Sequence, residues 1–81
     1  MTEADIKAVV VKHLAAIAPE ADLAALAGDA NIRRELDIDS YDFLNFLIAL
    51  NKETGVEIPE ADYGKLGTFK DMITYLAAHA G

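Results

Sequence analysis

The apolar residues of this 81-residue chain recur at steps of three and four positions, and no stretch sustains an alternation of apolar and polar residues. Such steps place side chains on one face of an α-helix, whereas alternation is typical of a half-buried strand. The spacing therefore predicts an all-α fold in which helices bury their apolar stripes against one another. Two stripes stand near the chain ends: Ile6, Val9, Val10, Leu14 and Ile17 in the first, and Phe69, Met72, Ile73 and Leu76 in the second.

Polar residues predict where these two helices begin. Thr2 and Asp5 have the spacing of a capping box, in which a hydroxyl and an acid satisfy free N–H groups of the first turn. Thr68 and Asp71 repeat that spacing ahead of the second stripe. Pro19 is expected to end the first helix, because a proline disfavours helical geometry in the residue before it.

A third main helix is predicted in the centre of the chain, from Ser40 to about Thr54. Asp39 is the expected N-cap, and Asp42, three residues further on, can complete a box-like arrangement. Gly55 is the expected stop, because glycine readily adopts the backbone conformation that ends a helix.

The apolar residues of the central helix cover more than one stripe. Leu44, Leu47 and Ile48 can face the core together, and in that register Phe43 and Phe46 cannot all be buried on the same side. A helix that is apolar nearly all round is either central to a bundle or offers part of its surface to another molecule. Both interpretations apply to the set Tyr41, Phe43, Leu44, Phe46, Leu47, Ile48 and Leu50.

Two connections separate the three main helices. The first, residues 18–39, is long and is expected to contain a short helical turn within residues 19–28; long loops in compact domains are often functional. The second is expected to hold one short helix near Glu60 to Lys65. The predicted architecture is a small bundle of three main helices plus one short helix, in a single domain, residues 1–81, with a long first connecting loop. Apolar side chains expected to anchor that loop to the core are Leu23, Leu26, Ile32, Leu36 and Ile38.

The composition excludes several classes of protein. The net charge of −7 argues against nucleic acid as a partner, because phosphates need lysine and arginine. The absence of cysteine excludes disulfides, thiolate metal sites and thiol catalysis. No segment approaches the ~18 uninterrupted apolar residues of a membrane span, and the N-terminal stretch does not resemble a signal peptide. We therefore expect a cytoplasmic protein that does not span a membrane. We also expect it to be a monomer.

Ser40 does not fit a hydrolytic site. A nucleophilic serine needs a base and an oxyanion site, and the only histidines, His13 and His79, come without a glycine-rich nucleophile elbow. A serine at a helix start commonly just satisfies a backbone donor. We expect no enzymatic activity.

The acids around Ser40 do not fit a calcium loop either. Asp37 and Asp39 match the first and third positions of an EF-hand loop, but Tyr41 stands at the fifth, Asp42 at the sixth and Ile48 at the twelfth. We expect no dedicated metal site.

A helix N-terminus does suit an anion, since its free N–H groups and dipole favour a phosphate. A serine there, followed by an apolar helix, could carry a phosphate ester. Asp39 and Asp42 would repel a second anion, so we expect them to contact a positively charged enzyme that installs the phosphate.

The segment LDIDSYDFLNFLIAL, residues 36–50, resembles the attachment site of acyl carrier proteins, whose pattern is Asp-Ser-Leu at the head of the second helix. Length, acidity, the long first connection and the run GVEIP also resemble that family. The resemblance implies that Ser40 carries 4′-phosphopantetheine from coenzyme A and that an acyl, polyketide or aminoacyl cargo is held as a thioester. It implies as partners a phosphopantetheinyl transferase and acyl-loading and acyl-transfer or synthase enzymes with basic docking patches. The alternative is an acidic helical interaction module without a prosthetic group.

The resemblance also implies two groups of contact residues. Partner recognition is expected to use Asp39, Tyr41, Asp42, Asn45, Glu53 and Glu57. The pocket for an acyl chain is expected to use Phe43, Leu44, Phe46, Leu47 and Ile58.

Some residues depart from the pattern of carriers in fatty acid synthesis. Tyr41 replaces the usual leucine, and Asn45, Asn51 and Lys52 stand where those carriers mostly have acids. These departures favour a specialised carrier over a member of the general fatty acid pathway.

Overall fold

The computed structural model describes residues 2–80, and within that range the regular structure is helical apart from an isolated bridge between Asn31 and Thr68. The predicted all-α bundle is confirmed; residues 1 and 81, the ends of the predicted domain, lie outside the described range. The three main helices are α1 (Glu3–Ile17), α3 (Ser40–Thr54) and α4 (Phe69–His79). The connections contain α2 (Ile32–Glu35) and the 3₁₀ helices η1 (Leu23–Ala25) and η2 (Glu60–Leu66).

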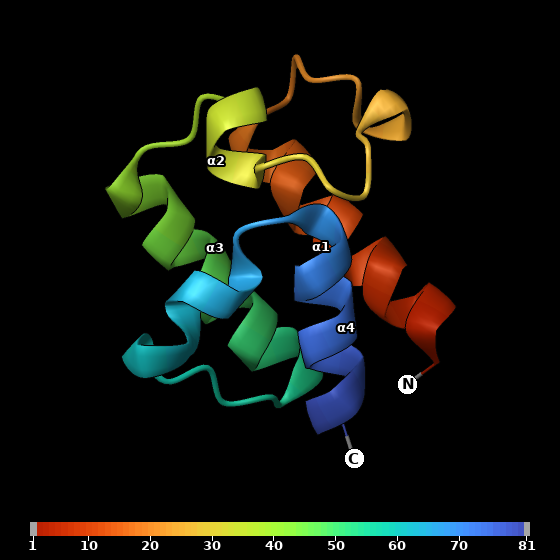
Figure 1. Ribbon diagram of the computed structural model, residues 1–81, viewed down its shortest axis with the longest axis vertical. Coiled ribbons are helices and arrows are strands. Elements are labelled where there is room, and N and C mark those ends of the chain that lie inside the picture. Colours follow the sequence, from red (N-terminus) through yellow and green to blue (C-terminus); the bar gives the residue numbers. More distant parts are fainter. Residues whose placement is uncertain (1, 81) are drawn as a thin grey trace.

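Helix α1 packs against both α3 and α4, and η2 packs against α4 (Figure 1). In Figure 1 the long first connection and α2 lie above these helices, and both chain ends leave on the opposite side. Ser40 therefore stands at the α2 end of the bundle, where the long connection enters α3.

The predicted helix starts are confirmed by hydrogen bonds. The Asp5 N–H donates to Thr2 Oγ1 (3.1 Å) and the Thr2 N–H donates to Asp5 Oδ2 (3.0 Å), which completes the capping box of α1. At α4 the Asp71 N–H donates to Thr68 Oγ1 (3.1 Å). The α1 helix ends at Ile17, two residues before Pro19.

Helix α3 has the predicted bounds. The Asp42 N–H donates to Asp39 Oδ1 (2.8 Å), so Asp39 is the N-cap. The structure shows this half of the predicted box-like arrangement. At the other end Gly55 has a φ of 75°, a left-handed conformation that favours glycine and stops the helix.

The predicted register of α3 was wrong. Leu44 and Ile48 are 43% and 44% exposed, whereas Phe43 and Phe46 are buried on the same side as Leu47. The buried positions 43, 46, 47 and 50 follow the steps of a single helical face. Burying that face is more favourable because it removes two aromatic rings from water along with the leucines. Aromatic rings bury more apolar area than aliphatic side chains.

The anchors of the long connection are confirmed, although one helix there was not predicted. Ile32 and Ile38 are buried, and Leu23, Leu26 and Leu36 pack partly buried against the core. The short turn predicted within residues 19–28 is present as η1. The additional four-residue helix α2 begins at Asn31, whose Oδ1 accepts from the Arg34 N–H (2.9 Å).

The position of α2 is fixed from both sides. The Ile32 N–H donates to the Gly67 carbonyl (3.0 Å), which ties α2 to the start of α4, and the Ile32 side chain is fully buried. Asp37 then turns the chain toward α3 with a φ of 53°, a conformation that aspartate tolerates better than most residues. Asp37 thus has a backbone role, and α2 holds Arg33 in a defined place before Ser40.

The short helix predicted near Glu60 to Lys65 is confirmed as η2, and a polar contact ties it to α4. The Tyr75 hydroxyl donates to Asp62 Oδ2 (2.7 Å), and Lys65 pairs with Asp62 (3.2 Å). The Tyr75 hydrogen bond and, secondly, Lys65 lower the pKa of Asp62. The tie fixes η2 against α4, and Tyr63 of η2 lines the grooves along α3 that are described below.

Candidate functional site

Ser40 is the first residue of α3. The residue before it, Asp39, is the N-cap, and its side chain already accepts a hydrogen bond from the Asp42 N–H in the first turn. The serine is exposed and is the only serine in the chain. The N-cap of α3 is therefore Asp39 and not the Ser40 hydroxyl. The Ser40 Oγ is left accessible at a helix N-terminus, where an anionic group is favoured.

Arg33 contacts this hydroxyl. Its Nη2 donates to Ser40 Oγ (2.8 Å), and its guanidinium carbon lies 5.5 Å from the centre of the Phe43 ring. The ring lies within the distance at which a guanidinium is attracted to an aromatic face. Sequence reasoning missed Arg33, because only the helical turn of α2 and the bend at Asp37 bring residue 33 beside residue 40.

Two grooves follow α3 away from this point. One, of about 380 Å³, begins at Ser40, and the other, of about 370 Å³, lies further along the helix. Tyr63 of η2 lines both and stands between them. The first is lined by Arg33, Ser40, Phe43, Leu44, Glu60 and Tyr63; the second is lined by Leu47, Ile48, Asn51, Glu57, Ile58, Pro59 and Tyr63.

These grooves contain four of the five residues predicted to form an acyl-chain pocket. Phe43 and Leu44 line the groove at Ser40, and Leu47 and Ile58 line the second. Phe46 is 1% exposed in the core and lines neither of them. Tyr63 was missed, since its position beside α3 depends on how η2 packs.

The residues predicted to recognise partners lie at the surface of the bundle. Asp39, Tyr41, Asn45, Glu53 and Glu57 are exposed and Asp42 is half-buried. Tyr41, at 74% exposure, shares a helix face with Leu44 and Ile48, at steps of three and four positions. The helical period places Asn45 and Lys52 beside this exposed face.

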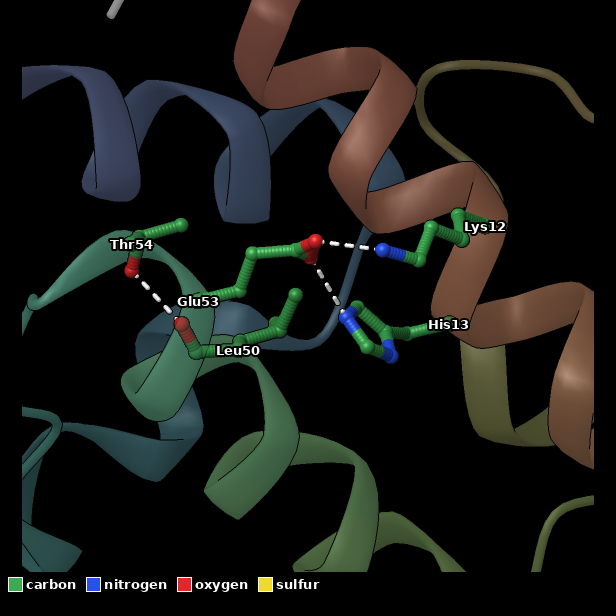
Figure 2. A network of polar contacts seen from close by, with 5 residues as sticks. All are labelled: Lys12, His13, Leu50, Glu53 and Thr54. Atoms are coloured by element: carbon green, nitrogen blue, oxygen red, sulfur yellow. Dashed lines mark hydrogen bonds and ion pairs between the residues drawn. The ribbon is translucent and has the colours of Figure 1, made fainter.

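Glu53 lies on a different side of α3, facing α1 (Figure 2). Its Oε1 pairs with Lys12, and its Oε2 lies 2.8 Å from His13 Nε2. The Lys12 contact and, secondly, the His13 contact lower the pKa of the Glu53 carboxyl. His13 is thus part of an interhelical polar network, and Glu53 links α3 to α1.

We expect the Glu53→Gln variant to be less stable than the wild type at neutral pH, with the difference shrinking in acid. A carboxyl whose pKa is lowered by folding adds stability above its unfolded pKa and loses it as pH falls through its folded pKa. Thermal unfolding of both proteins from neutral to acidic pH measures this. Glu57→Gln is the matched control, because Glu57 forms no ion pair within residues 2–80. A Glu53→Gln deficit that stays constant with pH would contradict the account.

Residues 2–80 lack the features of two other kinds of site. In residues 2–80 no group of three or more His, Cys, Asp or Glu side chains is arranged to hold a metal ion. Over that same range no helix has the length and apolar character needed to cross a membrane.

The residues around Ser40 fit a phosphate ester. The exposed hydroxyl supplies the ester oxygen, the first turn of α3 favours an anion, and the Arg33 guanidinium lies at the same atom. The groove that begins at Ser40 offers space for an attached chain beside Phe43 and Leu44.

Comparison with known proteins agrees with this chemistry. Residues 8–76 match the family model described as "Phosphopantetheine attachment site". The acyl carrier protein of Lactobacillus acidophilus is 34% identical over 71 residues, which cover 88% of this chain and 89% of the relative. That of Zymomonas mobilis is 35% identical over 74 residues, covering 91% and 88%.

A solved structure shares the fold over the whole chain. The solution structure of a protein from Anaplasma phagocytophilum, assigned to the acyl carrier proteins, superposes with a TM-score of 0.87 at 28% identity, covering 100% of this chain and 94% of that one. The family model spans most of the described bundle, from α1 to α4. The chain therefore belongs to the acyl carrier protein family, whose members bear a covalent 4′-phosphopantetheine and carry acyl groups on it.

Proposed function

We propose that Ser40 is the attachment residue and that this chain is a specialised carrier, one that delivers a particular class of acyl, polyketide or aminoacyl cargo. The observation that carries the first part is the exposed Ser40 hydroxyl at the N-terminus of α3, a helix that Asp39 caps independently; this hydroxyl accepts a hydrogen bond from Arg33. The prosthetic group, when bound, supplies a terminal thiol that holds cargo as a thioester.

The chain's own residues would present and shelter that group. Asp39 keeps the first turn of α3 ordered, which fixes the backbone at Ser40. Catalysis would be left to partners, namely a phosphopantetheinyl transferase and acyl-handling enzymes with basic docking patches. Peptide mapping of the modified protein tests the assignment: the added mass should lie on the tryptic fragment 35–52, in which Ser40 is the only serine.

The grooves beside α3 are the proposed binding site for the acyl chain of the cargo. Leu47 and Ile58 supply apolar walls, and each buried methylene contributes about 0.8 kcal/mol before any cost of opening the groove. We expect long acyl chains, but not short ones, to shift the methyl NMR signals of Leu47 and Ile58 and to raise the melting temperature. The methyl signals of Val10, buried in α1, are the control. Equal signals and melting temperatures for short and long chains would contradict this placement.

Charge on α3 supports a specialised role. Asn45 and Lys52 lie beside the exposed apolar face, at positions where carriers of fatty acid synthesis mostly have acids. Asn51 departs from that pattern for a structural reason, because its Nδ2 donates to the Val56 carbonyl (2.7 Å) and stabilises the turn after α3. The Asn45 amide donates to the Tyr41 carbonyl inside α3 (3.1 Å) and holds no turn in place. Of the three departures, Asn45 and Lys52 are therefore the ones proposed to affect partner choice.

We expect a generic ketosynthase of fatty acid synthesis to bind the double variant Asn45→Glu, Lys52→Glu about 3- to 150-fold more tightly than the wild type. Two gained ion pairs and one removed repulsion, at ~0.2 to 1 kcal/mol each, give this range. Titration at low and high salt measures it, because screening should remove most of the gain. The control, Asn45→Gln with Lys52→Arg, keeps the charges. Equal binding of all three proteins at low salt would show that these positions do not set partner choice.

A further inference from the structure

We propose that Arg33 is the phosphate-binding residue of the modified protein, pairing with the phosphodiester at Ser40 and directing the attached arm into the groove beside Phe43. This inference rests on attachment at Ser40 and assigns to that site a positioning residue. The motivating contact is the hydrogen bond from Arg33 Nη2 to Ser40 Oγ (2.8 Å).

The geometry of the unmodified site suits a phosphate ester at Ser40. A hydroxyl oxygen occupies one donor of the guanidinium, which has five N–H groups in a planar fork. Once Ser40 Oγ becomes an ester oxygen, the charged phosphate oxygens lie two covalent bonds further on, through phosphorus, within reach of the remaining donors. Guanidinium and phosphate then form a charge-assisted and frequently bidentate pair.

Arg33 is held in place and is available for this pairing. Its neighbour Ile32 is fully buried, and the Ile32 N–H bonds to the Gly67 carbonyl, so the backbone of α2 is fixed. The Phe43 ring lies 5.5 Å from the guanidinium and limits its orientation. Within residues 2–80 the ion pairs involve Lys12, His13 and Lys65, and Arg33 is in none of them.

The local charge makes such a residue useful. Asp37, Asp39 and Asp42 all lie within three residues of Ser40, so a phosphate there would meet several like charges. The N-terminus of α3 offsets part of that repulsion. Arg33 supplies a full positive charge at the ester oxygen itself, and it also lines the groove that Phe43, Leu44 and Tyr63 form.

The test compares four proteins, each before and after modification from coenzyme A: wild type, Arg33→Gln, Arg33→Lys and Arg34→Gln. Arg34 is the matched control, an exposed arginine next in sequence whose backbone N–H, rather than its side chain, makes the contact to Asn31. The first readout is the change in melting temperature on modification. The second is the ³¹P chemical shift of the phosphodiester and its dependence on salt.

Modification changes the melting temperature of each protein. We expect this change to be about 1 to 8 °C less favourable in Arg33→Gln than in the wild type. The ³¹P signal of Arg33→Gln should differ from the wild type and lose its salt dependence, whereas Arg34→Gln should match the wild type in both readouts. Arg33→Lys should fall between, because it keeps the charge and loses the fork.

Two results would overturn the inference while leaving attachment intact. In the first, the modified wild type and modified Arg33→Gln agree in both readouts. In the second, Arg34→Gln shows the same changes in both readouts as Arg33→Gln. Wild-type protein that gains no prosthetic group would instead refute attachment at Ser40, and the inference with it.

Discussion

Replacing Phe46 by alanine is expected to lower the free energy of unfolding by about 3 to 5 kcal/mol, because the ring is buried and would leave a cavity. Phe46 is 1% exposed, and its ring centre lies 6.1 Å from that of Phe43. A domain of this size has roughly 4 to 12 kcal/mol of stability, so the substitution should remove a large share of it. Urea unfolding followed by circular dichroism measures the loss.

Leu44→Ala is the matched control on the same helix. Leu44 is 43% exposed, so its truncation should cost less than about 1 kcal/mol. The pair distinguishes the observed register of α3 from the one that the sequence suggested. A larger loss for Leu44→Ala than for Phe46→Ala would contradict the observed register.

That register shows where sequence reasoning fails. Tyr41, Phe43, Leu44 and Ile48 are all apolar enough to be buried, so periodicity offers more than one face for the core. The choice among faces depends on which set of side chains fills the space between α1, α4 and η2, and that is a property of the packed bundle.

Helix ends were easier to predict because their signals are local. The caps at Thr2, Asp39 and Thr68 and the stop at Gly55 each depend on a few neighbouring residues, and the structure bears all four out. Helix α2 escaped prediction because four residues carry too little periodicity. Its stability comes from Ile32 in the core and from the Asn31 cap.

The residues of the candidate site also fall into those that the sequence predicts and those that it does not. Ser40 was identified from its motif, whereas Arg33 and Tyr63 become visible only once α2 and η2 are packed beside α3. Glu53 was predicted to recognise partners, and its contacts to Lys12 and His13, 41 and 40 positions away in the sequence, were not predicted. Long-range contacts of this kind leave no local pattern.

Ser40→Ala is expected to abolish attachment of 4′-phosphopantetheine completely while leaving the fold intact. Asp39 caps α3 on its own, so the substitution removes only the exposed hydrogen bond from Arg33, worth less than about 1.5 kcal/mol. Circular dichroism and thermal unfolding of the variant check that the helices persist. An unfolded variant would contradict the independent capping by Asp39.

The most direct test of the account is the intact mass of wild type and Ser40→Ala after incubation with coenzyme A and a promiscuous phosphopantetheinyl transferase. The account predicts that the wild type gains the mass of one 4′-phosphopantetheine group and that folded Ser40→Ala gains none. A wild type that stays unmodified with several such transferases, or a Ser40→Ala variant that gains the same mass, would contradict it.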